Sequence, residues 1–565
     1  MSDSRDRAKP DDLPRADRLM GAGIAALYVG WLLSTARNLG FARDEGFYFH
    51  ASTAYAGWFR NLLDDPRRAV SRGFVDAAWQ ANHEHPSLMK SLFALSYEWL
   101  HTRWHILADA STAFRLPGML MMGLALWVTY LFAARAYGRR AGLLAAGLLG
   151  LAPNVFYNAH LACFDVPIMA MWVSCIYVYW RSEANGGRWA ILAGIVFGLT
   201  LETKHNAWML PAVFLPHALV VHHATLARHL RVGRVPIPAS LVSMALLGPL
   251  VFVGLWPWLW NDTLPRVQEY VNFHLNHEYY NIEFLGRNYF GPPSPRAYAP
   301  VMIAATIPTV TLLLFVIGAA DRVRVLALRA RSWLSRTLRR ASLVVAPPRD
   351  RLETDLLVLL GFAVPLAVFF LPRTPIFGGT KHWFPAYPFL AILAGRGFDV
   401  VASRLEAALE GRLEPRLRRA AHAALAGLVL LGPILVTRHS HPFGLSTYVP
   451  FVGGTSGGAD LGLNRQFWGF TTQSLAPWLD RNAAKGASVF IHDTAWDSWA
   501  RLIDEKRLRP DLRGVGTPSE ADFSIVHHEL HMAEIDYNIW VEYAKATPDY
   551  VLTHDGVPIV SVYRK

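Results

Sequence analysis

The chain has 565 residues, of which 53% are hydrophobic and only 17% charged, a balance too apolar for a soluble protein. Its formal net charge of +12 is not that of a nucleic-acid binder, because the arginines stand between apolar runs rather than together on one polar face. Cys163 and Cys175 fall in one hydrophobic stretch, which excludes a disulfide framework. The composition therefore predicts a polytopic membrane protein.

Apolar runs long enough for a bilayer recur from the N-terminus onward. Since a helix needs about 20 apolar residues to cross, the sequence predicts about eleven spans. The first follows basic residues without a clean cleavage site and is interpreted as uncleaved. Glu202, Lys204 and Asn206 interrupt the fifth and sixth, which indicates a hairpin with a broken tip facing a polar cavity. The predicted spans lie near 19–40, 112–134, 141–158, 161–180, 188–203, 206–223, 239–260, 298–319, 354–371, 382–400 and 421–437.

Arginine-rich loops alternate with the others, and the positive-inside rule places them in the cytoplasm together with the N-terminus. An odd number of spans then puts the C-terminus outside. The arginine-rich positions are Arg135, Arg139, Arg140, Arg181, Arg188, Arg228, Arg231, Arg234, the run 322–351 and the run 404–419. The outer side is expected to hold residues 41–111, 261–297, 372–381 and everything after about 438.

The outer segments differ in character from the spans. Residues 41–111 mix aromatic, acidic and apolar residues, as is typical of amphipathic helices that roof a cavity. Residues 439–565 predict a separate α/β domain beside the membrane domain 1–438. Its expected elements are strands at 487–491 and 523–526, a terminal hairpin within 550–563, and helices at 497–507 and 532–546.

Two groups of polar residues stand out in the first outer loop. Asp44 and Glu45 come where the first span ends, and adjacent carboxylates at a membrane surface are costly unless they are used. The alternative is that Asp44 is the N-cap of the following helix. The triplet His83-Glu84-His85 lacks the spacing of a tetrahedral site, so no metal is predicted.

Charged residues of opposite sign also occur at one predicted membrane depth. Asp165 stands at the outer mouth of the fourth span and Lys204 at that of the fifth. Together they indicate a functional site. An internal salt bridge that fixes helix register is the alternative.

With these residues in view, the chain resembles the GT-C-fold glycosyltransferases that use polyprenyl-phosphate sugars, in the branch of the protein O-mannosyltransferases and the lipid A aminoarabinose transferase. The resemblance covers about 40–480 and rests on the order and sidedness of several short motifs. Ser87 replaces the second proline of one motif, and Val449 stands where asparagine is usual in another. The matching segments are Asp44-Glu45, His85–Lys90, Asp165, Thr203-Lys204, Lys381–Pro388 and His441–Gly454.

The resemblance implies a membrane enzyme that moves a sugar from a polyprenyl-phosphate donor to a lipid, protein or glycan acceptor. The donor tail would stay among membrane lipids while cations bind its phosphate at the outer interface. The implied phosphate ligands are His85, Lys90, Lys204, Lys381 and His382. Asp44 would act as general base, with Glu45 and Asp165 positioning the acceptor or completing the polar network. No metal and no cofactor is expected, since fixed cations match the leaving phosphate.

Two other classes remain open. A secondary transporter would also have many spans and a buried ionisable network, but short loops and an internal repeat are usual there, and the sequence has neither. A polytopic protein that binds glycans without turnover would also fit a large outer domain. The long outer loop and the outer domain favour the enzyme.

Overall fold

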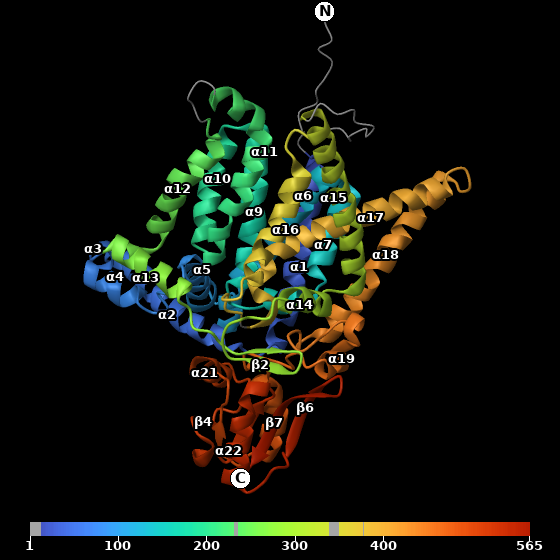
Figure 1. Cartoon of the computed structure of the whole chain (residues 1–565). Helices are drawn as coiled ribbons and strands as arrows, with labels where there is room; N and C mark the ends of the chain where they lie inside the picture. Colours follow the sequence, from blue (N-terminus) through green and yellow to red (C-terminus); the bar gives the residue numbers. More distant parts are fainter. Residues whose placement is uncertain (1–12, 231–235, 338–349, 377) are drawn as a thin grey trace, which may run out of the picture.

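The computed structural model describes residues 13–230, 236–337, 350–376 and 378–565. The fold is mostly helical, with one small sheet near the C-terminus (Figure 1). Long helices run beside one another, and the C-terminal unit lies at one end of them.

Each apolar run of the sequence falls on one or two helices. Among the described residues, four helical segments are long and apolar enough to cross a membrane, and a bent pair makes a fifth if it is one span. The four are Arg15–Asn38, Ala110–Tyr137, His205–His229 and Pro415–Ser440. The eleven-span count stays a prediction, since the other helices are shorter or more polar. The helices of this part are α1 (Arg15–Thr35), α6 (Ala110–Tyr137), α7 (Arg139–Gly150), α8 (Pro153–Ala159), α9 (Asp165–Asn185), α10 (Arg188–Leu201), α11 (Pro211–Leu230), α12 (Ala239–Leu255), α14 (Tyr298–Thr306), α15 (Thr309–Thr337), α16 (Thr354–Ala367), α17 (Tyr387–Leu409) and α18 (Pro415–Ser440).

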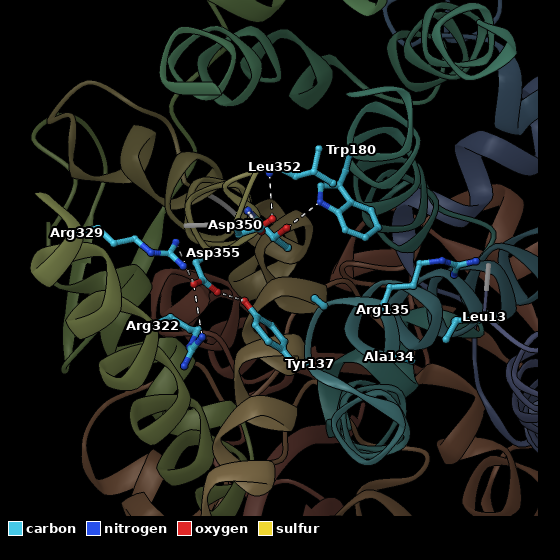
Figure 2. A pocket seen from close by; sticks show the side chains of 12 residues that line it. Leu13, Ala134, Arg135, Tyr137, Trp180, Arg322, Arg329, Asp350, Leu352 and Asp355 are labelled. Atoms are coloured by element: carbon cyan, nitrogen blue, oxygen red, sulfur yellow. Dashed lines mark hydrogen bonds and ion pairs between the residues drawn. The ribbon is translucent and has the colours of Figure 1, made fainter. Parts of the chain in front are cut away.

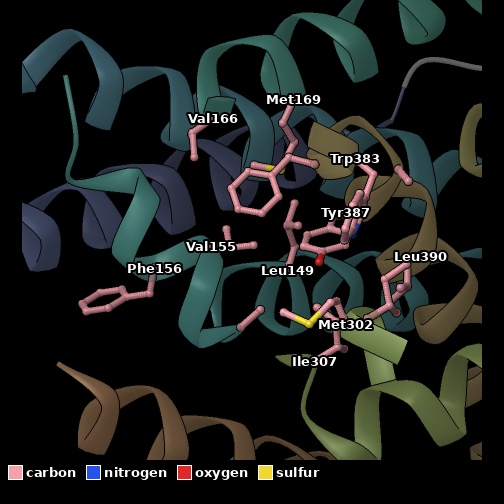
Figure 3. Close-up of a cluster of buried hydrophobic side chains, with 14 of the residues drawn as sticks. Leu149, Val155, Phe156, Val166, Met169, Met302, Ile307, Trp383, Tyr387 and Leu390 are labelled. Atoms are coloured by element: carbon pink, nitrogen blue, oxygen red, sulfur yellow. The ribbon is translucent and has the colours of Figure 1, made fainter. Parts of the chain in front are cut away.

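The centre of the helical part is packed with large apolar side chains. Leu149, Val155, Met169 and Leu390 meet around Tyr387 (Figure 3). Glycine permits close approach of neighbouring helices, because a Cβ at Gly395 of α17 would collide with the carbonyl oxygen of Ala141 in α7. Outer helices instead expose large apolar residues, such as Leu246 and Leu250 on α12 and Leu428 and Leu435 on α18. Exposed apolar faces of this extent fit contact with lipid.

The end of the helices opposite the C-terminal unit is rich in arginine. There a cavity of about 410 Å³ is lined by Arg135, Arg322 and Arg329 together with Asp350 and Asp355 (Figure 2). The hydroxyl of Tyr137 donates to Asp355 across it over 2.9 Å, which ties α6 to α16. The described parts of the arginine-rich segments thus lie together at the end of the helices opposite the C-terminal unit. The basic residues within 1–12, 231–235 and 338–349 lie outside the described residues.

The loops that the sequence predicts to be on the outer side are largely helical and lie between the long helices and the C-terminal unit; we keep the name outer loops for them. They contain α2 (Arg43–Asp64), α3 (Pro66–Ala69), α4 (Arg72–Trp79), α5 (Leu88–Ser96) and α13 (Thr263–Leu275), with a hairpin of β1 (Ile282–Phe284) and β2 (Arg287–Tyr289). Helices in the loop 41–111 agree with the prediction. Trp58 and Trp79 pack against Trp258 and Tyr270, so the two outer loops share a buried aromatic cluster.

The C-terminal unit is a five-stranded sheet with helices. The strand order is β4-β3-β5-β7-β6, in which β3 is parallel to β4 and β5, and β7 is antiparallel to β5 and β6. The predicted strands, terminal hairpin and two helices are present, whereas the short β4 was not predicted. The elements are α19 (Gly454–Asp460), α20 (Ala476–Asn482), β3 (Ser488–Phe490), α21 (Trp496–Asp504), β4 (Arg513–Val515), β5 (Phe523–His527), α22 (Ala533–Tyr543), β6 (Tyr550–His554) and β7 (Val557–Arg564).

One hydrophobic cluster joins this unit to the first outer loop. Phe41 and Phe49 of the loop belong to the same cluster as Leu479, Val489 and Ile525 of the unit. The unit is therefore docked on the loop through its own core. A domain boundary at 438/439 stays a prediction.

Candidate active site

Asp44 lies in the first turn of α2, nine residues after the last residue of α1. Its Oδ2 is 3.4 Å from Nζ of Lys381, and its side chain is 25% exposed. The N-cap position belongs to Ala42, and Glu45 is the carboxylate that accepts the Ala42 N–H, over 3.0 Å. The helix-cap interpretation of Asp44 is therefore wrong. This leaves the Asp44 carboxylate facing a lysine at the end of the helices nearest the C-terminal unit.

Lys381 is a buried cation held from two sides. It lies in the 3-10 helix Gly379–Ala386, just after Gly378 and Gly379, both of which have a positive φ. Its Nζ lies 3.8 Å from the ring centroid of Trp468, which belongs to the C-terminal unit. An aromatic face stabilises a cation without neutralising it. Lys381 thus joins the helical part, the first outer loop and the C-terminal unit at one point.

A second lysine–carboxylate pair lies nearby. Nζ of Lys204 donates to Oδ1 of Asp165 over 2.6 Å, and both side chains are nearly buried. Lys381 and His382 lie within electrostatic range of Asp165 as well. Nδ2 of Asn206 donates to the His382 carbonyl over 3.2 Å, which links the break after α10 to the segment before α17.

These contacts bring together Asp44, Asp165, Lys204, Lys381 and His382 from four separate stretches of the chain. We call these five residues the charged cluster. Two carboxylates alternate with two ammonium groups, so a ligand phosphate could replace a carboxylate partner without leaving a lysine unpaired. The salt-bridge alternative for Asp165 and Lys204 agrees with their direct contact and does not exclude this exchange.

Glu45 lies apart from the charged cluster although it follows Asp44 in sequence. Both of its oxygens bind Arg115 of α6, at 2.8 and 2.7 Å, and neither side chain is exposed. One oxygen also accepts the N–H of Ala162 over 3.0 Å. Arg115 in turn donates to the carbonyls of Ala36, Leu39 and Gly40. Glu45 is thus fully occupied in fixing the chain between α1 and α2.

Lys90 and His85 also have partners of their own. Nζ of Lys90 donates to the carbonyl of Asn82 and, over 2.9 Å, to that of His85, and burial lowers the pKa of Lys90 to about 7. The His85 ring packs against Tyr48, Phe164 and His274, and burial lowers its pKa well below the usual value. The structure does not bring Lys90 into the charged cluster.

The same loop is nevertheless tied to the Lys204 region. Oγ of Ser87 donates to Oε2 of Glu202 over 3.0 Å, and the N–H of Leu88 donates to the Glu202 carbonyl. Glu202 stands two residues before Lys204. The bonds from Ser87 and Leu88 to Glu202 therefore help to fix the backbone that carries Lys204.

The C-terminal unit adds acidic residues that the sequence did not indicate. Nη1 of Arg43 is 2.6 Å from Oδ1 of Asp493, and the Arg43 N–H donates to the Trp468 carbonyl over 2.8 Å. Burial raises the pKa of Asp493 to about 6, and Asp44 adds to the rise while Arg43 opposes it. Burial also raises the pKa of Glu529, with Asp493 acting in the same direction. Asp44 therefore lies beside Lys381 and also within electrostatic range of the Asp493 carboxyl group.

Part of the chain matches a known protein family in sequence. Residues 94–253 match the sequence model of the family described as dolichyl-phosphate-mannose-protein mannosyltransferase. The match confirms, over this stretch, the resemblance that the motifs indicated. It includes Asp165 and Lys204 but neither Asp44 nor Lys381. No curated protein sequence matches the chain.

Similar solved structures cover nearly the whole chain at low identity. ArnT from Cupriavidus metallidurans bound to undecaprenyl phosphate is 15% identical, with a TM-score of 0.42 over 96% of this chain and 97% of that one. The archaeal oligosaccharyltransferase AglB from Archaeoglobus fulgidus, in complex with an inhibitory peptide and a dolichol-phosphate, is 11% identical, with a TM-score of 0.48 over 94% of this chain and 71% of that one.

Proposed function

We propose that the chain is an integral-membrane glycosyltransferase of the GT-C kind, which moves a sugar from a polyprenyl-phosphate donor to an acceptor hydroxyl on the extracytoplasmic face. The convergence of Asp44, Asp165, Lys204 and Lys381 at one end of apolar helices carries this proposal. The family match over residues 94–253 supports the donor class.

Lys204 and Lys381 are the proposed ligands of the donor phosphate. Both are largely buried, so a phosphate that displaces Asp165 or Asp44 from them meets a cation with little competing water. Trp468 would keep Lys381 in place during this exchange, since its ring covers the ammonium group. His382, the next residue after Lys381, is proposed as a further ligand of the phosphate.

Asp44 is the proposed general base. It would take the proton of the acceptor hydroxyl while that oxygen forms a bond to the anomeric carbon. The bond from the anomeric carbon to the phosphate oxygen breaks in the same step, and the lysines stabilise the charge of the leaving polyprenyl phosphate. A direct displacement of this kind inverts the anomeric centre. The partial exposure of Asp44 allows an acceptor to reach it.

The remaining predicted residues are proposed to act indirectly. Asp165 would orient Lys204, and Glu45 would fix the start of α2 through Arg115. Lys90 and His85 would shape the loop behind Lys204 rather than contact phosphate themselves.

Loss of either phosphate lysine should weaken donor binding. Lys204→Met and Lys381→Met each remove a charge-assisted contact of about 1.5–3 kcal/mol, which corresponds to roughly ten- to hundred-fold in Kd. Binding of a labelled polyprenyl-phosphate sugar to purified protein would measure this. Lys485→Met, at an exposed position of the C-terminal unit, is the matched control and should bind like the wild type. Wild-type affinity for the donor in both variants would show that Lys204 and Lys381 do not bind its phosphate.

The proposed topology predicts where a reporter enzyme is active. A reporter that works only outside the cytoplasm should be active when fused after Lys565 and inactive when inserted after Gly411, between α17 and α18. Activity measured in whole cells provides the comparison. The reverse pattern would place the charged cluster on the cytoplasmic face and contradict an extracytoplasmic reaction.

Substrate identity can be approached directly. Purified protein incubated with a panel of radiolabelled polyprenyl-phosphate sugars should transfer or hydrolyse at least one of them. Binding without turnover across the panel would favour a glycan-binding protein over an enzyme.

A further inference from the structure

Three metal-ligating side chains converge where the last long helix meets the C-terminal unit. His439 lies in the last turn of α18, His554 is the last residue of β6, and Asp555 begins the short turn that leads to β7. Nε2 of His439 is 2.7 Å from one oxygen of Asp555, and Nε2 of His554 is 3.8 Å from the other. One ligand atom from each residue lies within 4.8 Å of the others, an arrangement found at no other group of His, Cys, Asp or Glu in the described part of the chain.

Two hydroxyl groups contact these side chains. Oγ1 of Thr455 donates to Oδ2 of Asp555 over 2.7 Å, and Oγ1 of Thr447 lies 2.9 Å from Nε2 of His554. Thr455 is a partner of the kind that holds a metal ligand in position, whereas Thr447 contacts the nitrogen of His554 that faces Asp555, so an ion would take the place of that contact. His554 is nearly buried, whereas His439 is open to the surface beside a cavity of about 310 Å³ that Asp555 also lines. An ion can therefore reach the three ligand atoms from the surface through this cavity.

We propose that His439, His554 and Asp555 bind a transition-metal ion of the zinc type, with water in the fourth position. Two imidazoles and a carboxylate suit Zn²⁺ and its neighbours, whereas Mg²⁺ and Ca²⁺ prefer oxygen ligands alone. The ion would replace the direct contact between His439 and Asp555. None of the three residues belongs to the charged cluster, so this site is separate from the proposed transferase chemistry.

Such an ion would link segments that are distant in sequence. His439 and Asp555 are 116 residues apart, and the first belongs to a helix that is apolar enough to cross a membrane. The metal would fasten the β6–β7 turn to the end of that helix. Because a metal that binds only the folded state stabilises it, zinc should raise the temperature at which the whole protein unfolds.

Zinc binding to the full chain tests the proposal. Protein purified without a polyhistidine tag and treated with chelator should bind one Zn²⁺ by calorimetry, and Co²⁺ should give the absorption bands of a tetrahedral site. His439→Gln and Asp555→Asn should each weaken binding by roughly tenfold or more, since even outer partners of metal sites cost about 10–100-fold. Asparagine tolerates the positive φ of 51° at position 555, so the second variant keeps the turn.

His223→Gln is the matched control, because His223 is an exposed histidine outside the trio. It should bind zinc like the wild type, and zinc should raise the unfolding temperature of both. A wild-type protein that binds no zinc, or equal binding by wild type, His439→Gln and Asp555→Asn, would overturn the site.

Discussion

Asp44→Asn is expected to lower sugar transfer by about 10²–10⁴-fold, the usual contribution of a general base. The substitution keeps the size of the side chain and its ability to accept a hydrogen bond from Lys381, but it removes the group that takes the acceptor proton. Protein yield and donor affinity should stay close to wild type, since Lys204 and Lys381 remain. Transfer from a labelled donor and donor binding, measured on the same preparation, separate the two effects.

The same helix provides a matched control for this experiment. Asp64 is the last residue of α2 and is exposed, so Asp64→Asn makes an identical chemical change away from the charged cluster. A carboxylate in the first turn of a helix contributes only about 0.3–1 kcal/mol through the helix dipole. Helix stability alone therefore cannot explain a large loss in Asp44→Asn. Near-wild-type transfer by this variant would overturn the assignment and make Asp165 the next base to test.

Arg115→Met is expected to destabilise the protein by about 3–5 kcal/mol, because it leaves the Glu45 carboxylate buried without its counter-ion. It also frees the carbonyls of Ala36, Leu39 and Gly40, which Arg115 holds at the start of the first outer loop. Thermal unfolding in detergent and the monomeric fraction on size exclusion would measure the loss. Activity per folded molecule should fall as well, since the position of Asp44 depends on this turn.

Two further variants test whether the loss of stability comes from the unpaired charge of Glu45. Arg412→Met removes an exposed arginine between α17 and α18 and should leave stability unchanged. The double variant Glu45→Gln with Arg115→Met should recover part of the loss, because no isolated charge remains. Equal unfolding temperatures for Arg115→Met and Arg412→Met would show that the buried pair does not hold the loop.

The sequence was sufficient for features that depend on local pattern. Apolar runs predicted the long helices, and short β-branched runs such as 487–491 and 523–526 predicted strands. It was insufficient where a helix is broken by local geometry. The run 141–158, for instance, bends by 71° between α7 and α8. Apolar composition does not report such a break, so the number of crossings is the weakest part of the prediction.

Contacts between distant segments could not be predicted from residue types. Asp44 and Glu45 form one carboxylate pair in the sequence, but successive positions on a helix point about 100° apart. One therefore faces Lys381, while the other is buried against Arg115. Asp493 lies 450 residues from Arg43 and carries no motif. A lone buried arginine in an apolar helix, such as Arg115, is the one signal that could have indicated an acidic partner in the first loop.

The docking of the C-terminal unit on the first outer loop has a consequence for protein engineering. Trp468 covers Lys381, and Asp493 binds Arg43 beside Asp44, so residues after 438 form part of the wall around the charged cluster. A chimaera that keeps the helices and takes this unit from another protein would therefore lose the contacts of Trp468 with Lys381 and of Asp493 with Arg43. Exchanging the C-terminal unit to alter acceptor recognition would therefore also alter the residues around the charged cluster, because the unit and the first outer loop share one hydrophobic core.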